Sequence, residues 1–233
     1  MIPALNDLRI VELSRLILHE AHDAARLARV RENIGDEGVQ RNPVIVAPYG
    51  DRYLLLDGAH RARALEELGC RLALVQLVKL PERAGSWGHL LDDARLEEAL
   101  RSVEEVEVSE TEPERGCLTE ARFHGGGKLF VRAREEGLAP AVRALWAFRK
   151  VYLEGGVVRR VDPGRSVGPP GQAVIFYQRF TPEELAAFVS AGEVLPASVT
   201  RFIVEERILN VRYPLGLLEK GKPTVRNADS GIS

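Results

Sequence analysis

The chain has 233 residues, of which 45% are hydrophobic and 28% charged, and its net charge is −2. This is the composition of an ordinary globular protein, long enough to bury a core in one or two domains. The charge balance predicts no surface for nucleic acid, and no apolar run is long enough to span a membrane. Only Cys70 and Cys117 occur, without a CxxC motif, which fits the reducing cytoplasm and argues against a disulfide framework.

The first predicted strand covers residues 8–13, where apolar residues alternate. Three titratable side chains then follow within four positions of the stretch LILHEAHD: His19, Glu20 and His22. They precede an amphipathic helix whose N-cap is expected to be Asp23. Histidine and carboxylate both bind zinc, but no HExxH motif or second ligand cluster is present, so a polar loop is the simpler interpretation of these residues.

The central region predicts, in order, a strand, a tight turn, a strand, a helix and a strand. Apolar runs at 44–47 and 53–56 predict two strands, and Pro48–Asp51 has the residues of the turn that joins them. Good helix formers then occupy 59–68, and a third apolar strand is expected over 72–78. The strand, helix and strand from residue 53 onward predict a short βαβ unit.

The turn between the second strand and the helix carries chemistry. Asp57, Gly58, Ala59, His60 and Arg61 occupy it. Backbone N–H groups at the start of a helix face outward with a partial positive charge and commonly bind phosphate. Arg61 has the planar guanidinium that can hold such an anion through two hydrogen bonds.

Beyond residue 78 the pattern is less specific. Trp87 lies in a loop and would ordinarily be a core or interface residue. Apolar spacing predicts a helix over 90–103, and the acidic stretch 104–115 predicts a solvated strand or a linker, so a domain boundary is expected nearby. The sequence FHGGGK at 123–128 lacks the spacing of a P-loop and favours a hairpin turn.

The last third predicts a helix over 141–153 with a buried face that includes Trp146, and a helix opened by a capping box at 181–184. Residues 200–213 predict two strands joined around Glu205 and Glu206. Arginines that recur along this hairpin would ordinarily only solvate it: Arg201, Arg207 and Arg212. Two remaining segments are expected to be a Pro/Gly-rich loop carrying Arg165 and a polar tail from residue 220.

Several of these motifs resemble a known family. The stretch LLLDGAHR at 54–61 resembles the DG-x-HR signature of the ParB/sulfiredoxin-like superfamily, whose turn binds nucleotide phosphates. LILHE at 16–20, RNPVIV at 41–46 and LPASVTRFIVEERILNVRYPL at 195–215 are similar to segments of the free L-serine kinases. The resemblance covers most of the chain, although residues 104–158 match by position more than by motif.

This resemblance implies an α/β protein with a ParB/sulfiredoxin-like N-terminal lobe and a smaller α+β C-terminal lobe. Residues 1–105 would form the nucleotide-binding domain and residues 106–233 the substrate-side domain, with the active cleft between them. The implied reaction is phosphorylation of free L-serine to O-phospho-L-serine, with ADP or ATP as the phosphate donor and Mg²⁺ as cofactor.

The resemblance also implies roles for individual residues. Glu20 corresponds to the glutamate that acts as catalytic base, and Asp57 would orient substrate or metal. Four consecutive residues would hold the donor phosphates: Gly58, Ala59, His60 and Arg61. Three residues match substrate-binding positions: Trp87, Thr200 and Arg201. The kinases often have a histidine beside that arginine, where this chain has Phe202.

A ParB-like regulator that binds DNA or a protein partner without catalysis is the alternative from another class. The net charge of −2 and the lack of a helix-turn-helix pattern oppose it. Sulfiredoxin activity is disfavoured further, because Ala59 stands where its cysteine would belong.

Overall fold

The computed structural model describes residues 7–92, 96–154, 158–162 and 170–219. The chain divides into two compact units: unit 1 takes the residues up to Ile17, Asp23–Leu80 and those from Val204, and unit 2 takes Leu18–His22 and Pro81–Ile203. The boundary expected at residue 105 lies inside unit 2, because strands from both sides of that residue pair in one sheet.

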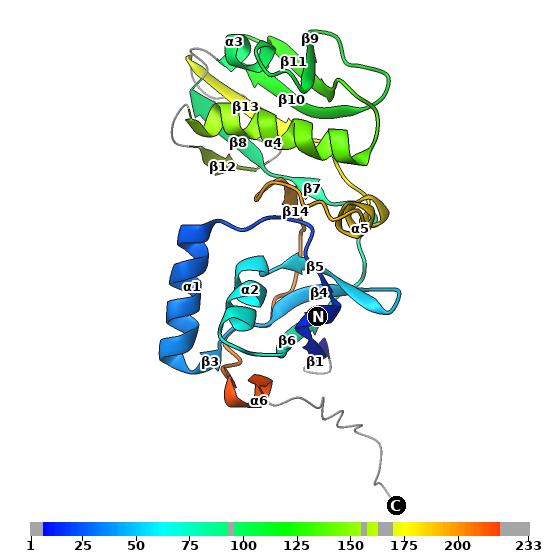
Figure 1. The fold of residues 1–233 in the computed structure, drawn as a ribbon. Coiled ribbons are helices and arrows are strands. Elements are labelled where there is room, and N and C mark those ends of the chain that lie inside the picture. The colour runs from blue at the N-terminus through cyan, green and yellow to red at the C-terminus, as the bar shows by residue number, and fades with distance from the viewer. Residues whose placement is uncertain (1–6, 93–95, 155–157, 163–169, 220–233) are drawn as a thin grey trace, which may run out of the picture. The chain divides into compact units, whose positions relative to one another are not determined.

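Unit 1 is built on a five-stranded sheet with the order β1-β6-β4-β5-β2 (Figure 1). The strands are β1 (Leu8–Glu12), β2 (Leu16–Ile17), β4 (Val44–Tyr49), β5 (Arg52–Asp57) and β6 (Leu72–Leu77). The predicted hairpin is confirmed, since β4 and β5 pair antiparallel. The predicted βαβ unit is wrong: β4 lies between β5 and β6 and runs parallel to β6, so β5 and β6 run in opposite directions.

Helices and short pairings complete unit 1. They are the 3₁₀ turn Leu13–Arg15, α1 (Ala24–Glu37), α2 (Ala59–Glu67), α6 (Gly216–Glu219), and the pair β3 (Val39–Gln40) with β15 (Tyr213–Pro214). Asp23 is the N-cap of α1, as predicted, and its side chain accepts the Arg26 N–H at 2.6 Å. The core is apolar and closed to solvent, with Val44, Leu54 and Leu65 fully buried.

Unit 2 contains a six-stranded sheet with the order β12-β8-β13-β10-β11-β9. The strands are β8 (Gly88–Asp92), β9 (Val106–Ser109), β10 (Cys117–Phe123), β11 (Lys128–Ala133), β12 (Arg159–Val161) and β13 (Gln172–Tyr177). The helix predicted over 90–103 is wrong at its start, because Leu90 and Leu91 pair with β13 and are buried in the sheet. A short apolar run fits either element, and here strand pairing decides.

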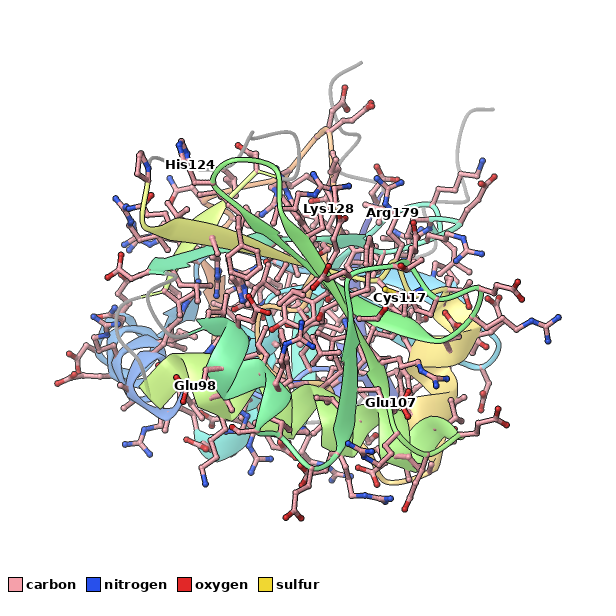
Figure 2. The ribbon with its side chains drawn as sticks, turned by 90° about the horizontal axis from the view of Figure 1, so that it is seen from above. Glu98, Glu107, Cys117, His124, Lys128 and Arg179 are labelled. Atoms are coloured by element: carbon pink, nitrogen blue, oxygen red, sulfur yellow. The ribbon has the colours of Figure 1, made fainter. Side chains whose placement is uncertain are left out.

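The glycine-rich run between β10 and β11 forms a hairpin turn, as predicted. Gly125 and Gly126 have φ values of 90° and 95°, a backbone conformation that favours glycine. Figure 2 shows His124 and Lys128 at this turn, and both residues are exposed. Lys128 forms an ion pair with Glu120 at 2.9 Å rather than facing a phosphate site.

The helices of unit 2 are α3 (Leu96–Arg101), α4 (Leu138–Glu154) and α5 (Pro182–Ser190), and its short pair is β7 (Gly85–Ser86) with β14 (Thr200–Arg201). Figure 1 shows α4 lying along the six-stranded sheet. The predicted capping box of α5 is confirmed between Thr181 and Glu184. The prediction that Trp146 on α4 is buried is wrong. Its side chain is 42% exposed, and its indole N–H donates to the Val194 carbonyl at 2.9 Å.

The hairpin predicted over residues 200–213 does not form. Thr200 and Arg201 pair with β7, whereas Tyr213 pairs with β3. Between them the chain is irregular, and the positive φ values of Asn210 (60°) and Arg212 (57°) interrupt an extended strand. The loop carrying Arg165 and the tail from residue 220 lie outside the described residues. In the described part, no helix has the length and apolar character to cross a membrane.

Candidate functional site

The turn predicted to bind phosphate connects β5 to α2 in unit 1. Gly58 is the N-cap of α2 with φ at 104°, and no side chain in the described residues caps this helix start. The backbone angle favours glycine, and a Cβ atom on Gly58 would lie 2.8 Å from Nη2 of Arg61, so it would displace that guanidinium. Backbone N–H groups at such a helix start commonly bind anions.

Two arginines converge on Asp57 at this turn. Nη2 of Arg61 and Nη1 of Arg207 each lie 3.0 Å from Oδ2 of Asp57. Partial burial would raise the pKa of the Asp57 carboxyl, but the charge and hydrogen bond of Arg61 and the charges of Arg207 and Arg26 outweigh it and lower that pKa. Asp57 is thus held as a carboxylate within a positively charged turn.

The His60 side chain forms a hydrogen bond with the backbone of Asp23. Its Nε2 accepts the Asp23 N–H at 3.1 Å, so it ties the start of α1 to the start of α2. This contact gives His60 a structural role.

The Glu20 carboxylate is the centre of a second group of residues, which lies in unit 2. The short segment that carries it is bound to Leu195: the Leu195 N–H donates to the His19 carbonyl and the Ala21 N–H donates to the Leu195 carbonyl, each at 2.8 Å. This pairing directs the Glu20 side chain toward the backbone of residues 198–200, which follow Leu195 in the chain.

Three donors hold that carboxylate. Oε1 of Glu20 accepts the Thr200 N–H and, at 2.7 Å, the Thr200 hydroxyl, while Oε2 accepts the Ser198 N–H at 2.9 Å. Burial raises the pKa of Glu20, and the two Thr200 bonds, the Ser198 bond and the charge of Arg149 oppose that rise. The pKa of the carboxyl stays above its usual value, which suits a group that must accept a proton.

His19 lies behind this network and supports it. Its Nε2 is 3.0 Å from the Thr200 hydroxyl oxygen, and because that hydroxyl donates to Glu20, His19 must be the donor in this contact. Burial lowers the pKa of His19 to about 4, so the ring is neutral. Phe202 packs edge-on against the ring at 5.8 Å between centroids, which fills the place where the kinases often have histidine.

Ser198 joins three parts of unit 2. Its carbonyl accepts the Nε2–H of buried His89 at 3.0 Å, and its hydroxyl accepts a hydrogen bond from Arg160. Its φ of 70° is unusual for a residue other than glycine and turns its N–H toward Glu20. Such strained residues cluster at functional sites.

The predicted substrate residues also gather in unit 2. The guanidinium carbon of Arg201 lies 4.3 Å from the centre of the Trp87 ring, and that of Arg160 lies 5.8 Å from it. Arg201 also forms an ion pair with the exposed Asp162. Trp87 is therefore a surface on which two arginines stack, a role that its position in the sequence did not indicate.

Arg149 was missed by the sequence analysis, because an arginine within a predicted helix gives no signal. Its charge acts on both Glu20 and His89. Its Nη1 is buried and has no hydrogen-bond partner within the described residues. Ser198, Arg160 and Arg207 were missed for the same kind of reason, since only long-range contacts reveal their positions.

A metal site formed by His19, Glu20 and His22 finds no support in the structure. His19 and Glu20 are engaged with Thr200, and His22 is exposed. Across the residues that the structure describes, no three His, Cys, Asp or Glu side chains are grouped to hold a metal ion.

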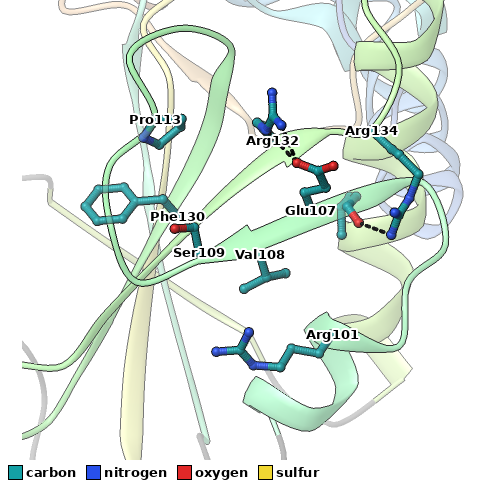
Figure 3. A pocket seen from close by; sticks show the side chains of 9 residues that line it. Arg101, Glu107, Val108, Ser109, Pro113, Phe130, Arg132 and Arg134 are labelled. Atoms are coloured by element: carbon teal, nitrogen blue, oxygen red, sulfur yellow. Dashed lines mark hydrogen bonds and ion pairs between the residues drawn. The ribbon is translucent and has the colours of Figure 1, made fainter.

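A pocket of about 330 Å³ lies elsewhere in unit 2, beside the edge strand β9 (Figure 3). Its charged side chains already have protein partners: Arg132 pairs with Glu107, and Arg134 donates to backbone carbonyls. None of the predicted site residues lines this pocket, so we do not assign the site to it.

No family model matches the chain. It is 29% identical over 218 residues to the ATP-dependent L-serine kinase SbnI of Staphylococcus aureus, a match over 91% of this chain and 84% of that relative. A stretch of 62 residues is 40% identical to the ATP-dependent L-serine kinase of Staphylothermus marinus, covering 26% of this chain and 25% of the relative.

Solved structures agree with these matches. The structure of SbnI with a C-terminal truncation has a TM-score of 0.79 at 23% identity, covering 93% of this chain and 91% of that one. A free serine kinase in complex with AMP has a TM-score of 0.69 at 21% identity, covering 91% and 93%. The chain therefore has the α/β fold of the free serine kinases. The resemblance to the free L-serine kinases, predicted from its motifs, is confirmed by the relatives, of which SbnI is matched over 84% of its length.

Proposed function

We propose that this protein is a kinase that transfers a phosphoryl group from a nucleotide to the hydroxyl group of free L-serine, forming O-phospho-L-serine. The observation that carries the proposal is the match over 91% of the chain to a relative named as an ATP-dependent L-serine kinase. The carboxylate network around Glu20 and the turn at Asp57 supply groups suited to this chemistry.

The turn after β5 would bind the donor. The N–H groups at the start of α2 and the guanidinium of Arg61 are suited to phosphate oxygens. We take ATP as the donor because the matched relatives are named ATP-dependent, and ADP is the alternative.

Glu20 would accept the proton of the serine hydroxyl. Among the described residues, Oε2 accepts one hydrogen bond and keeps a free lone pair, whereas Oε1 accepts two. As the serine oxygen bonds to the γ-phosphorus of ATP, the bond from that phosphorus to the bridging oxygen breaks and ADP leaves. The hydroxyl proton passes to Oε2 of Glu20.

Arg201 and Trp87 would hold the serine molecule. A guanidinium stacked on an indole ring is fixed in one plane and can bind a carboxylate or a phosphate group. The Thr200 hydroxyl is committed to Glu20, so Thr200 acts on the substrate through that carboxylate.

Mg²⁺ is the expected cofactor, and Asp57 is the residue that would help to hold it. Mg²⁺ typically binds one or two carboxylates together with the phosphates of the substrate. Asp57 fits, because it is kept ionised and both arginines contact the same oxygen, Oδ2. The ion would offset the negative charge of the donor phosphates. The free thiols Cys70 and Cys117 support the expected cytoplasmic location.

The test is an assay of the purified protein with L-serine, Mg²⁺ and either ATP or ADP, in which phosphoserine and the released nucleotide are both measured. We expect phosphoserine in equal amount to the ADP released from ATP, or to the AMP released from ADP. Absence of phosphoserine with both donors would contradict the proposal and favour a regulator without catalysis.

A further inference from the structure

Arg207 reaches the turn at Asp57 from a distant part of the chain. It lies in the irregular segment between β14 and β15, 150 residues after Asp57. Its Nη1 is 3.0 Å from Oδ2 of Asp57, the same oxygen that Nη2 of Arg61 contacts at 3.0 Å. The turn thus has a second arginine that its own motif does not contain.

Gln76 on β6 fixes the backbone on both sides of this arginine. Its side-chain Nε2 donates to the Glu206 carbonyl at 2.8 Å, and its Oε1 accepts the Ile208 N–H at 2.9 Å. The Gln76 side chain is only 2% exposed, and both bonds are partly buried. The bonds hold the residues immediately before and after Arg207, which limits where its side chain can point.

The two hydrogen bonds from Gln76 fix the backbone around Arg207 more firmly than a surface ion pair would need. The Arg207 side chain is 41% exposed, and an ion pair that open contributes little to stability. One arginine would already neutralise Asp57, whereas three act on it: Arg61, Arg207 and Arg26. Several guanidinium groups beside the start of a helix suit a ligand with several negative charges.

We infer that Arg207 is a further phosphate-binding residue of the donor site and that Gln76 is its positioning residue. The inference rests on the proposed function, because the ligand is the polyphosphate of the nucleotide donor. Arg207 would contact phosphate oxygens with the part of its guanidinium that Asp57 does not use.

The first test measures the affinity of ADP and ATP for purified Arg207→Ala by calorimetry, beside wild type and Arg61→Ala. We expect a loss of about 10- to 100-fold, the usual effect of removing a charge-assisted contact. Arg207→Lys should recover part of the affinity, because it keeps the charge but loses the planar fork. Arg63→Ala is the matched control, since Arg63 lies on the same helix as Arg61 and, within the described residues, its ion pairs are with Glu66 and Glu67 of that helix.

The second test asks whether Gln76 acts through Arg207. Gln76→Leu should weaken ADP binding, and the double variant Gln76→Leu/Arg207→Ala should bind ADP no more weakly than Arg207→Ala alone. A purely structural role for Gln76 would instead make the two losses multiply. Melting temperatures measured without ligand separate loss of fold from loss of binding.

The outcomes distinguish this inference from the proposed function. If wild type phosphorylates serine and Arg207→Ala binds ADP within twofold of wild type, the inference is wrong and the proposed function stands. If wild type binds neither ADP nor ATP, both fall. Loss of affinity in Arg207→Ala but not in Arg63→Ala, with an unchanged melting temperature, supports the inference.

Discussion

At the scale of single residues, the Glu20 carboxyl is subject to opposing effects. Burial raises its pKa, while the donors at Thr200 and Ser198 and the charge of Arg149 lower it. The remaining rise brings the carboxyl closer to the working pH, where a base is most effective. The same donors leave one lone pair of Oε2 free, so the side chain is fixed without being fully occupied.

Replacing Glu20 by Gln should abolish most of the turnover. The amide cannot accept a proton as a carboxylate does, so kcat should fall by roughly 10²–10⁴-fold. One amide N–H₂ group would also face a backbone N–H at Ser198 or Thr200, so a lower melting temperature is expected as well. ATP affinity, measured separately, should change little. A variant with near wild-type kcat would remove Glu20 from the mechanism.

Thr200→Val should shift the pH dependence of turnover in a known direction. Turnover needs the deprotonated carboxylate and is lost as pH falls through the raised pKa of Glu20. The Thr200 hydroxyl bond lowers that pKa, so its removal should raise the pKa further and move the acid side of the rate profile to higher pH. A profile that stays in place, or moves to lower pH, would argue against Glu20 as the titrating base.

At the scale of elements, the turn proposed to bind phosphate depends on how β5 meets α2. The chain reverses at Gly58 with φ at 104°, and the space beside it is filled by the Arg61 side chain. A second glycine, Gly69, follows the other end of α2 with φ at 83°, but no atom lies near its missing Cβ. The two glycines that flank α2 therefore share a positive φ but differ in whether a side chain would contact a neighbour.

Gly58→Ala should therefore weaken ATP binding, whereas Gly69→Ala should not. Each alanine must adopt a left-handed conformation, which costs roughly 1–2 kcal/mol of stability. Only at residue 58 does the new methyl group also displace Arg61 from Asp57. Chemical denaturation and nucleotide titration of both variants make the comparison. Equal nucleotide affinities in the two variants would show that the turn does not position Arg61 for the ligand.

At the scale of the whole molecule, acid sensitivity is expected from two buried histidines of unit 2. Burial lowers the pKa of His19 and of His89 to about 4, and the charge of Arg149 adds to the effect on His89. An unfolded chain takes up these protons near pH 6.5, while the folded protein does so only near pH 4. The histidines therefore favour folding above pH 6.5, and this contribution is lost as pH falls to about 4.

His89→Gln tests this linkage and keeps a donor for the Ser198 carbonyl. The stability difference between wild type and His89→Gln should shrink as pH falls from 7 to 4.5, by up to roughly 3 kcal/mol. Urea unfolding followed by tryptophan fluorescence reports on unit 2, since it contains both tryptophans, Trp87 and Trp146. His124→Gln, at the exposed hairpin turn, controls for removing a histidine from the surface. A constant difference across this pH range would contradict the linkage.

The sequence alone determined the features that depend on neighbours a few residues apart. The hairpin at Pro48–Asp51, the cap at Asp23 and the capping box at Thr181 were all predicted correctly, because turns and caps follow from the local residue types. The motif at residues 57–61 located the turn that precedes α2 for the same reason.

Only the tertiary structure decided which distant segments meet. The pairing of β4 with β6, the strand at Leu90 and the contact of Glu20 with Thr200 all join residues whose partners no local pattern identifies. Arg207 looked like a solvating charge until the chain after β14 proved to run beside Asp57. Packing of the whole chain sets such contacts, because an apolar run or an isolated charge is compatible with many partners until burial selects one.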